Sequence, residues 1–296
     1  MPLAKDIWRP LLIDAPIETI LREGTIAGHA QQWLPAEGFF RFLADPFGLI
    51  DDGRLHIFVE QYDYRTRHGT IECLLYDAAL TLLGRRRVLQ EPWHLSYPFV
   101  FKAEGAIWML PEAHRSGALT LYRAEEFPWR WVPAARIALD QVAVDATPVF
   151  HDGLWWLFYA SADRAVDKTS ALFAAWAEKL EGPWRSHPGN PLRRDPANSR
   201  PGGTPVMVDG RLVLPVQDCS RTYGGAIRPL WIDTLTPERF AAEPGAPIVA
   251  PAAFLPFDQG LHTLSAVGDR TLVDVKQRLL SPRSLAVLAR RELRRR

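Results

Sequence analysis

Polar side chains with catalytic or binding chemistry stand at the two ends of one hairpin-like segment, "ADPFGLIDDGRLHIFVEQYD" (44–63). Asp45 opens its first apolar run and Glu60 closes the second, with the turn Asp52-Gly53 between them. An Asp-Gly pair between two β-type runs predicts a β-hairpin. In such a hairpin the start of the first strand and the end of the second lie side by side. We therefore expect both carboxyls at the same end, where they can accept hydrogen bonds from the hydroxyls of a sugar.

This pattern recurs four times along the chain. Further copies occupy 96–114, 146–163, 203–218 and 261–277, and the five turns contain Gly53, Gly105, Gly153, Gly210 and Gly268. Weaker apolar runs follow the first four hairpins, at 70–77, 118–124, 170–177 and 226–235. A repeat of roughly 50 residues, with one strong hairpin and weaker strands after it, is typical of β-propeller blades.

The repeat predicts an all-β fold, a five-bladed β-propeller with short terminal helices. We expect a single domain over 1–296, with blades at roughly 40–90, 91–140, 141–195, 196–250 and 251–280. The segments at both termini should pack outside the ring or close it. The best helix candidates are 15–24 and 281–296. A β-sandwich built from similar hairpins is the alternative fold, but the regular period favours the propeller.

Radial packing of five hairpins would bring all of their polar ends to one face. The candidates for acid–base chemistry on that face are Asp45, Glu112, Asp145 and Asp218. The candidates for substrate binding are Glu60, His94, Tyr97, His114, Arg115, Arg200, Gln217, Tyr223 and His262. Carboxylates, histidines and arginines that converge beside aromatic rings are typical of a site for a small polar ligand, and a sugar fits this chemistry.

Several of these residues also have a structural interpretation. Asp45 precedes a proline and could cap a turn, whereas its place at a strand start favours a functional role. Glu112 fits a general acid, a hydrogen-bond acceptor for substrate or a charge on the rim. Arg200 is either a loop residue or a group that binds a carboxylate or phosphate. The histidines are structural or substrate-binding. They match no compact metal-ligand spacing, so no metal and no cofactor is expected.

The bulk composition argues against several classes of protein. A net charge of +1 provides no field for nucleic acid. Two cysteines, Cys73 and Cys219, are too few for a disulfide framework or a metal-ligand set, and they fit a reducing compartment. No apolar run approaches the length of a membrane span, and the N-terminus has no continuous apolar segment of signal-peptide type. We expect a soluble, cytoplasmic protein.

The ordered segments resemble two known families. "ADPFGLIDDGRLHIFVE" and "VDATPVFHDGLWWLFYAS" resemble the blades of family 43 glycoside hydrolases, which are five-bladed propellers. A closer resemblance is to the N-terminal region of glucosamine inositolphosphorylceramide transferases and their bacterial relatives. It is carried by "EPWHLSYPFVF", "MLPEAH", "EGPWRSHPGNP", "RPGG", "QDCSRTYGG" and "GLHTL", and it spans about residues 44–263. The plant transferases also carry a separate glycosyltransferase domain, and we expect these 296 residues to hold the propeller alone.

The resemblance to the hydrolases implies roles for particular residues. Asp45 takes the position of the general base, and Asp145 the position that orients the substrate and tunes the acid. The general acid of those hydrolases is a glutamate that opens a later blade, but here that blade opens "RPGGTPV" (200–206). Glu112 or Asp218 is expected to substitute for it. An inverting mechanism needs two carboxyls about 6.5–9.5 Å apart, and its acid needs a raised pKa.

These observations favour a carbohydrate-active enzyme that cleaves or transfers a glycosyl group. Its substrate would be a sugar, a nucleotide-sugar or a glycolipid. Two alternatives remain open. One is a propeller that binds a sugar or a glycolipid headgroup without catalysis. The other is an accessory module for a partner glycosyltransferase or formyltransferase.

Overall fold

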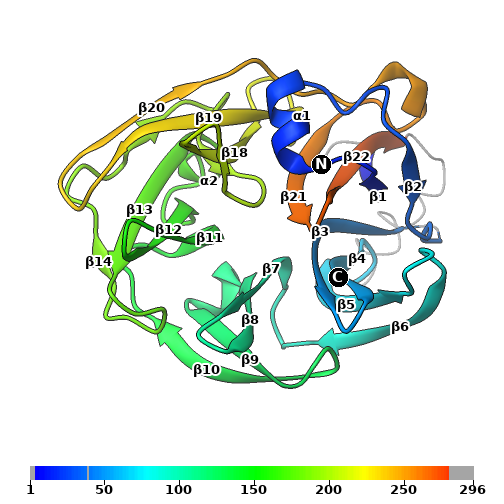
Figure 1. Ribbon diagram of the computed structural model, residues 1–296, viewed down its shortest axis with the longest axis horizontal. Helices are drawn as coiled ribbons and strands as arrows, with labels where there is room; N and C mark the ends of the chain where they lie inside the picture. Colours follow the sequence, from blue (N-terminus) through cyan, green and yellow to red (C-terminus); the bar gives the residue numbers. More distant parts are fainter. Residues whose placement is uncertain (1–3, 39, 280–296) are drawn as a thin grey trace, which may run out of the picture.

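Five antiparallel sheets lie around a common axis in the computed structural model, which describes residues 4–38 and 40–279 (Figure 1). This arrangement confirms the predicted five-bladed β-propeller. The first four hairpins and the weaker strands that follow them form the first four blades in chain order. The alternative of a β-sandwich is wrong, because the sheets form a ring and not two stacked layers.

The strands of the first four blades follow the predicted order. The first blade contains β3 (Arg41–Asp51), β4 (Arg54–Asp63), β5 (His68–Tyr76) and β6 (Leu82–Leu89). The second contains β7 (Ser96–Ala103), β8 (Ala106–Glu112), β9 (Leu119–Glu126) and β10 (Arg130–Ile137). The third contains β11 (Ala143–His151), β12 (Leu154–Ser161), β13 (Ala171–Ala177), β14 (Arg185–Ser186) and β15 (Arg193–Arg194). The fourth contains β16 (Arg200–Pro201), β17 (Val206–Val208), β18 (Arg211–Asp218), β19 (Ala226–Leu235) and β20 (Phe240–Pro244).

The fifth blade joins the two ends of the described chain. Its strands are β21 (Leu261–Val267), β22 (Arg270–Leu279), β1 (Lys5–Ile13) and β2 (Gln31–Trp33). Strand β1 pairs with β22 from Lys5↔Leu279 to Ile13↔Thr271, so the N-terminal segment (blue in Figure 1) completes a sheet that the C-terminal hairpin begins. This antiparallel ladder closes the ring.

Helices are few and short. Helix α1 (Ile17–Glu23) confirms the helix predicted at 15–24, and it ends at Gly24, whose left-handed φ of 69° caps the last turn. Helix α2 (Asp167–Ser170) lies in the third blade. The helix predicted at 281–296 lies outside the described residues. Among the described residues, no helix has the length and apolar character that crossing a membrane requires.

Five apolar clusters fill the spaces between neighbouring blades. Pairs that represent them, in order around the ring, are Phe58 and Phe99, Trp108 and Leu157, Trp156 and Leu214, Val213 and Leu264, and Leu12 and Leu43. Trp155 and Trp156 are neighbours in β12 but belong to different clusters, because successive side chains of a strand point to opposite faces. Each large side chain that is fully buried in this way stabilises the fold by about 1.5–3 kcal/mol.

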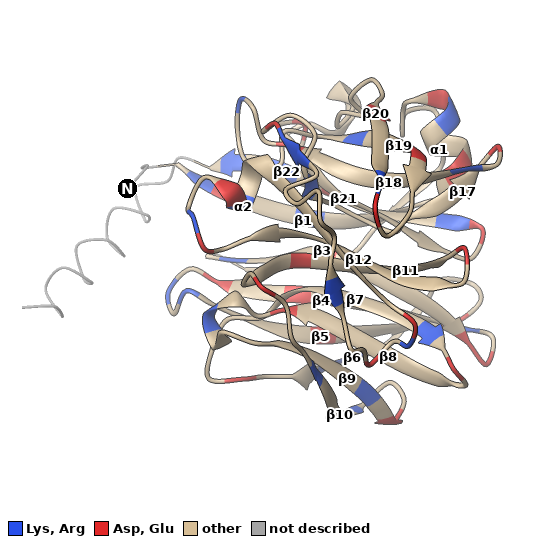
Figure 2. Ribbon diagram, turned by 90° about the vertical axis from the view of Figure 1, so that its left-hand side faces the viewer, with Lys and Arg blue, Asp and Glu red and all other residues tan. Residues whose placement is uncertain are grey.

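Charged side chains contribute less than the apolar clusters to the stability of the ring. Figure 2 shows Lys and Arg interspersed with Asp and Glu along the blades. Exposed pairs such as Arg22–Asp209 at 2.9 Å and Arg211–Asp233 at 2.6 Å are screened by solvent and contribute little to stability. The apolar clusters therefore dominate the stability of the propeller.

The fourth blade differs from the others at the axis. Its inner strand is split into β16 and β17, which both pair with β18. Between them the backbone of Gly203 bridges to Leu264 of β21, and Leu264 donates its N–H to the carbonyl of Gly202 at 2.8 Å. A Cβ at Gly203 would lie 1.8 Å from the carbonyl oxygen of Leu264, so no side chain fits at this position.

We predict that Gly203→Ala destabilises the propeller by about 3 kcal/mol or more, because the added Cβ must displace backbone. Gly84→Ala is the matched control, since nothing lies within 4 Å of a Cβ built at Gly84 of β6. Urea unfolding of both variants measures the difference. Equal unfolding midpoints for Gly203→Ala and the wild type would contradict the close approach of the fourth and fifth blades.

Candidate functional site

Backbone bulges bring the predicted site residues together at the axis. The pairing register shifts between Ala44 and Phe47 in β3, Ser96 and Phe99 in β7, Val144 and Thr147 in β11, and Leu261 and Thr263 in β21. The residues in these bulges include Asp45, Tyr97, Asp145 and His262, and the first three have φ values of 49°, 45° and 50°. A bulge bends its strand and redirects a side chain. The same irregularity in four blades therefore directs four functional groups to one place.

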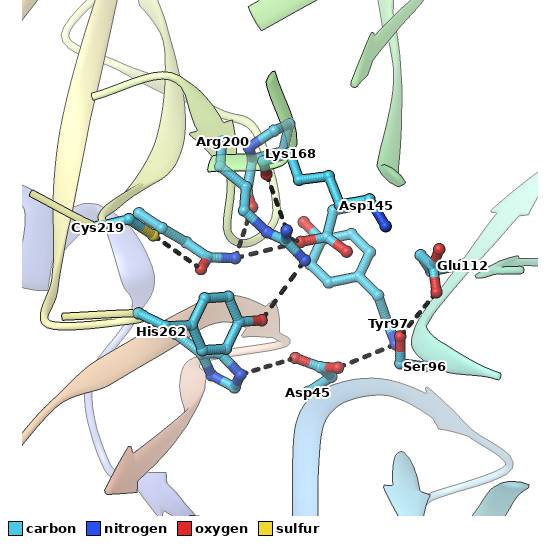
Figure 3. Close-up of polar contacts among 12 residues, drawn as sticks. Asp45, Ser96, Tyr97, Glu112, Asp145, Lys168, Arg200, Cys219 and His262 are labelled. Carbon is cyan, nitrogen blue, oxygen red and sulfur yellow. Dashed lines mark hydrogen bonds and ion pairs between the residues drawn. The ribbon is translucent and has the colours of Figure 1, made fainter. Parts of the chain in front are cut away.

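Two carboxylates and an imidazole form a hydrogen-bonded chain at the floor of this cluster. Nδ1 of His262 donates to Oδ1 of Asp274 at 2.7 Å, and Nε2 lies 3.4 Å from Oδ1 of Asp45 (Figure 3). Burial lowers the pKa of His262, but the fields of Asp274 and Asp45 outweigh it and leave this pKa raised. Burial raises the pKa of Asp45 to about 6, against the field of His262. The fields of the two neighbouring carboxyl groups thus favour the protonated form of His262.

The N-terminal strand supports this chain. The indole of Trp8 in β1 stacks on His262, with ring centroids 3.7 Å apart and planes 7° from parallel. The ammonium of Lys276, which is fully buried, lies 5.2 Å from the centroid of Trp8. Two basic side chains therefore contact one indole, an arrangement that the quadrupole of the ring favours.

A second ion pair faces the first across the axis. Nε of Arg200 donates to Oδ2 of Asp145 at 2.7 Å, and Gln217 donates to the same oxygen at 3.2 Å (Figure 3). Arg200 also donates to the carbonyl of Lys168 at 2.8 Å and lies over the ring of Tyr223. Burial raises the pKa of Asp145 and Arg200 opposes this, with a net rise.

Glu112 is held by a third set of donors. Its carboxylate accepts hydrogen bonds from Nδ1 of His114 at 2.5 Å, from the backbone N–H of His114 at 2.8 Å and from Ser96 at 3.1 Å. Nζ of Lys168 lies 3.0 Å from Nε2 of His114. Burial would raise the pKa of Glu112, but the bonds from His114 and its field leave this pKa lowered.

Tyr97 belongs to β7 of the second blade, and its hydroxyl contacts the backbone of the fourth blade at Gly203. Its hydroxyl accepts the N–H of Gly203 at 2.8 Å and bonds to Thr147 at 2.9 Å, and the side chain is fully buried. Tyr97 therefore contacts protein with its polar atom. The segment "RPGGTPV" (200–206) brings no carboxyl to this place, and a phenol from the second blade binds its backbone.

Glu60 and His94 lie beside Asp45 at the end of the first blade. Oε1 of Glu60 is 3.5 Å from Nε2 of His94, and Nδ1 of His94 accepts the N–H of Gly69 at 2.9 Å. Burial raises the pKa of Glu60 well above its ordinary value, and the field of Asp45 raises it further. Burial lowers the pKa of His94 to about 4. This pair is close enough for a salt bridge, but burial favours the neutral form of both groups.

Two predicted residues lie apart from the cluster. Asp218 follows Gln217 in β18, so the two side chains point to opposite faces, and only Gln217 reaches Asp145. Arg228 and Ser220 bind the carboxylate of Asp218, and they lower its pKa although burial opposes them. Arg115 is exposed beside His114. The structure thus brings neither residue into contact with Asp45.

Two carboxylates and one imidazole are candidate ligands for a cation. Asp45, His262 and Asp274 each offer a ligand atom, and these atoms lie within 4.8 Å of one another. Both nitrogens of His262 face a carboxyl group, and the fields of these groups raise its pKa and so favour the doubly protonated ring. A metal requires a free imidazole lone pair, so these residues fit an ion-pair chain better than a metal site.

Exposure increases from the floor of the cluster to its rim. Asp145 is 3% exposed and Asp45 6%, whereas Tyr223 is 39% exposed. A cavity of about 290 Å³ lies elsewhere, between Gly117–Leu119 and Arg136–Ala143, and none of its lining residues belongs to the cluster. The converging polar groups, and not cavity volume, locate the candidate site.

Sequence reasoning did not nominate three residues that complete the cluster. Asp274 lies in β22 of the fifth blade, and the sequence pattern assigns it no role. Lys168 lies in α2, a short helix that the strand pattern does not predict. Trp8 lies in β1, more than 250 residues from its partner His262. No local signal identifies such a contact, because it depends on how the ring closes.

Comparisons with known proteins agree with both resemblances. A family model described as "Glucosamine inositolphosphorylceramide transferase 1, N-terminal" matches residues 30–248. The protein of that name from Oryza sativa subsp. indica is 36% identical over 247 residues, which are 77% of this chain and 32% of the rice protein. The one from Arabidopsis thaliana is 34% identical over 220 residues, or 73% and 28% of the two chains. This chain spans about a third of the length of these relatives.

Solved structures with a similar fold are glycoside hydrolases. A family 117 enzyme from Zobellia galactanivorans has a TM-score of 0.56 at 13% identity and covers 85% of this chain and 91% of its own. A family 43 enzyme from Xanthomonas citri has a TM-score of 0.55 at 16% identity and covers 82% and 89%. At such low identity these likenesses establish the propeller fold alone.

We predict that His94→Asn changes how stability depends on pH. The pKa of His94 falls from about 6.5 in the unfolded chain to about 4 in the folded one. Above pH 6.5 the histidine therefore does not lower the free energy of unfolding. As pH falls from 6.5 to 4, it lowers this free energy by up to about 3 kcal/mol. The asparagine side chain would keep an acceptor for Gly69 without titrating. Urea unfolding at pH 7, 5.5 and 4 should show the wild type losing stability relative to His94→Asn, and parallel curves would refute a neutral His94.

Proposed function

Because this chain belongs to the family of the N-terminal region of glucosamine inositolphosphorylceramide transferase 1, we propose that it is a carbohydrate-active domain that cleaves or transfers a glycosyl group at the axial end of its propeller. The reacting groups would be the side chains that converge from the five blades. The proposal concerns this domain, since the chain spans about a third of its curated relatives.

One observation carries the proposal, namely the placement of Asp45 and Asp145 at equivalent bulges in blades one and three. Both carboxyls are buried, and both have raised pKa values. A general base works best when its pKa is near the working pH. Asp45, with a pKa of about 6, is mostly ionised at pH 7 and still accepts a proton readily.

The two carboxyls would have different tasks. Asp45 would remove the proton from the attacking water or acceptor hydroxyl, and His262 would stabilise the carboxylate before the reaction. Asp145 is fixed by Arg200 and Gln217 through Oδ2, and Oδ1 has no hydrogen-bond partner among the described residues. We infer that this oxygen accepts a hydrogen bond from a sugar hydroxyl and orients the ring.

The names of the relatives suggest a substrate class. The names of the relatives include glucosamine and an inositolphosphoryl headgroup. We propose that the substrate is a glycan of this kind that is attached to a phosphate group. Lys168 fits the phosphate, since its ammonium has one hydrogen-bond partner, His114, among the described residues. Arg115 is exposed and follows His114, the partner of Lys168, and its planar guanidinium would bind the same group.

A second candidate function is headgroup binding without catalysis. It is favoured by the fourth blade, where Gly203 and the hydroxyl of Tyr97 fill the place at which the hydrolases carry an acid. Such a domain would present a sugar or glycolipid headgroup to a partner glycosyltransferase or formyltransferase.

We predict that Asp45→Asn lowers kcat/KM about 100- to 10,000-fold on any glycoside that the wild type turns over, because the base is lost. A panel of aryl glycosides and glucosamine-linked inositol phosphates provides the assay. Asp209→Asn, at an exposed turn at the opposite end of the fourth blade, is the control that should leave the rate unchanged. Calorimetric binding of a panel member without turnover, unaffected by Asp45→Asn, would instead support headgroup binding.

A further inference from the structure

The proposed reaction needs a group that protonates the leaving oxygen, and the two carboxyls that the sequence offered for this role do not suit it. Glu112 and Asp218 each accept hydrogen bonds from charged or backbone donors, and both have lowered pKa values. A carboxyl with a lowered pKa is ionised at neutral pH and has no proton to give.

Glu60 differs from every other carboxyl of the cluster in its partners. No lysine, arginine or backbone N–H among the described residues donates to it, and its side chain is 8% exposed. Its one close polar neighbour is Nε2 of His94 at 3.5 Å. Nδ1 of His94 accepts the N–H of Gly69, so the proton of the neutral ring is on Nε2 and points toward Glu60.

The backbone leaves room for Glu60 at this place. A Cβ at Gly69 would lie 2.7 Å from Oε1 of Glu60, 2.7 Å from Cε1 of His94 and 2.3 Å from the carbonyl oxygen of Leu95. Glycine at position 69 therefore allows the carboxyl and the imidazole to meet beside the strand. The contact is part of the packing between the first blade and the chain that enters the second.

Glu60 also stands next to the base. It is paired with Ala44 in the ladder between β3 and β4, and Asp45 is the next residue. The largest charge effects on Glu60 come from four acidic groups, Asp45 of β3, Glu112 of β8, Asp274 of β22 and Asp145 of β11. Together with burial, these fields keep its pKa well above the ordinary value.

We propose that Glu60 is the proton donor of the axial site and that Asp45 and Glu60 form its acid–base pair. This inference rests on the proposed function. In the reaction a water oxygen forms a bond to the anomeric carbon while Asp45 takes a proton from that water. The bond from the anomeric carbon to the leaving oxygen breaks, and the proton of Glu60 passes to that oxygen. Asp45 ends protonated and Glu60 ionised, and exchange with solvent restores both; in transfer, an acceptor hydroxyl replaces the water.

Leaving groups of different basicity test this assignment. Glu60→Gln should lower kcat about 100- to 10,000-fold on alkyl or disaccharide substrates, whose leaving oxygen needs a proton. On glycosyl fluorides or dinitrophenyl glycosides, which leave without one, it should keep kcat within about tenfold of the wild type. Asp45→Asn should lose activity on both classes. Glu126→Gln, an exposed position on β9, is the matched control. Equal losses on both classes, or none on either, would overturn the role of Glu60.

A second readout does not depend on turnover. The infrared carbonyl band of a protonated carboxylic acid should be present in the wild type at pH 7 and weaker by one group in Glu60→Gln, while thermal unfolding confirms that the variant folds. A Glu60 that is ionised at pH 7 overturns the inference even if the protein is active. A protonated Glu60 in a protein that turns over no glycoside of the panel overturns the proposed function, and the catalytic role of Glu60 with it.

Discussion

The ladder between β1 and β22 is the interaction on which the rest of the structure depends. Without β1 the fifth blade would be the hairpin of β21 and β22, because β2 pairs with β1. An isolated two-stranded hairpin is marginally stable in water. Strand β1 also contributes Leu11 and Ile13 to the cluster shared with the fourth blade and Leu12 to the cluster shared with the first. The same strand carries Trp8, which stacks on His262. Ring closure and the floor of the candidate site therefore share one element.

Crowded carboxyls are the electrostatic problem that this site must solve. Two like charges 4 Å apart repel by about 4 kcal/mol at an effective dielectric constant of 20. Two of the carboxyls are paired with basic side chains, Asp45 with His262 and Asp145 with Arg200. Glu112 has three hydrogen-bond donors instead. Glu60 has no such partner among the described residues, and burial together with the fields of the other carboxyls raises its pKa well above the ordinary value.

Much of this architecture could be predicted from the sequence, because hairpin signals are local. The Asp-Gly turns have φ values that only a few residue types adopt easily, such as 49° at Asp52 and 67° at Gly53. The polar ends of the hairpins followed from strand geometry. The roles within the cluster could not be predicted, since they depend on contacts between blades. Glu112 carries the right group for an acid, yet a neighbouring histidine, His114, decides its protonation.

The fourth blade explains why the proton donor would lie elsewhere in this propeller. Gly203 packs its backbone against Leu264, so blades four and five meet at the axis without a side chain between them. Tyr97 then bonds to the freed N–H of Gly203. This arrangement leaves no space for a carboxyl from the fourth blade. In the proposed reaction the acid would therefore come from another blade, and Glu60 of the first blade lacks the cation that would favour its ionised form. If base and acid both belong to the first blade, the bond that breaks lies over β3 and β4. Blades three and four, through Asp145 and Arg200, are then free to hold the rest of the substrate.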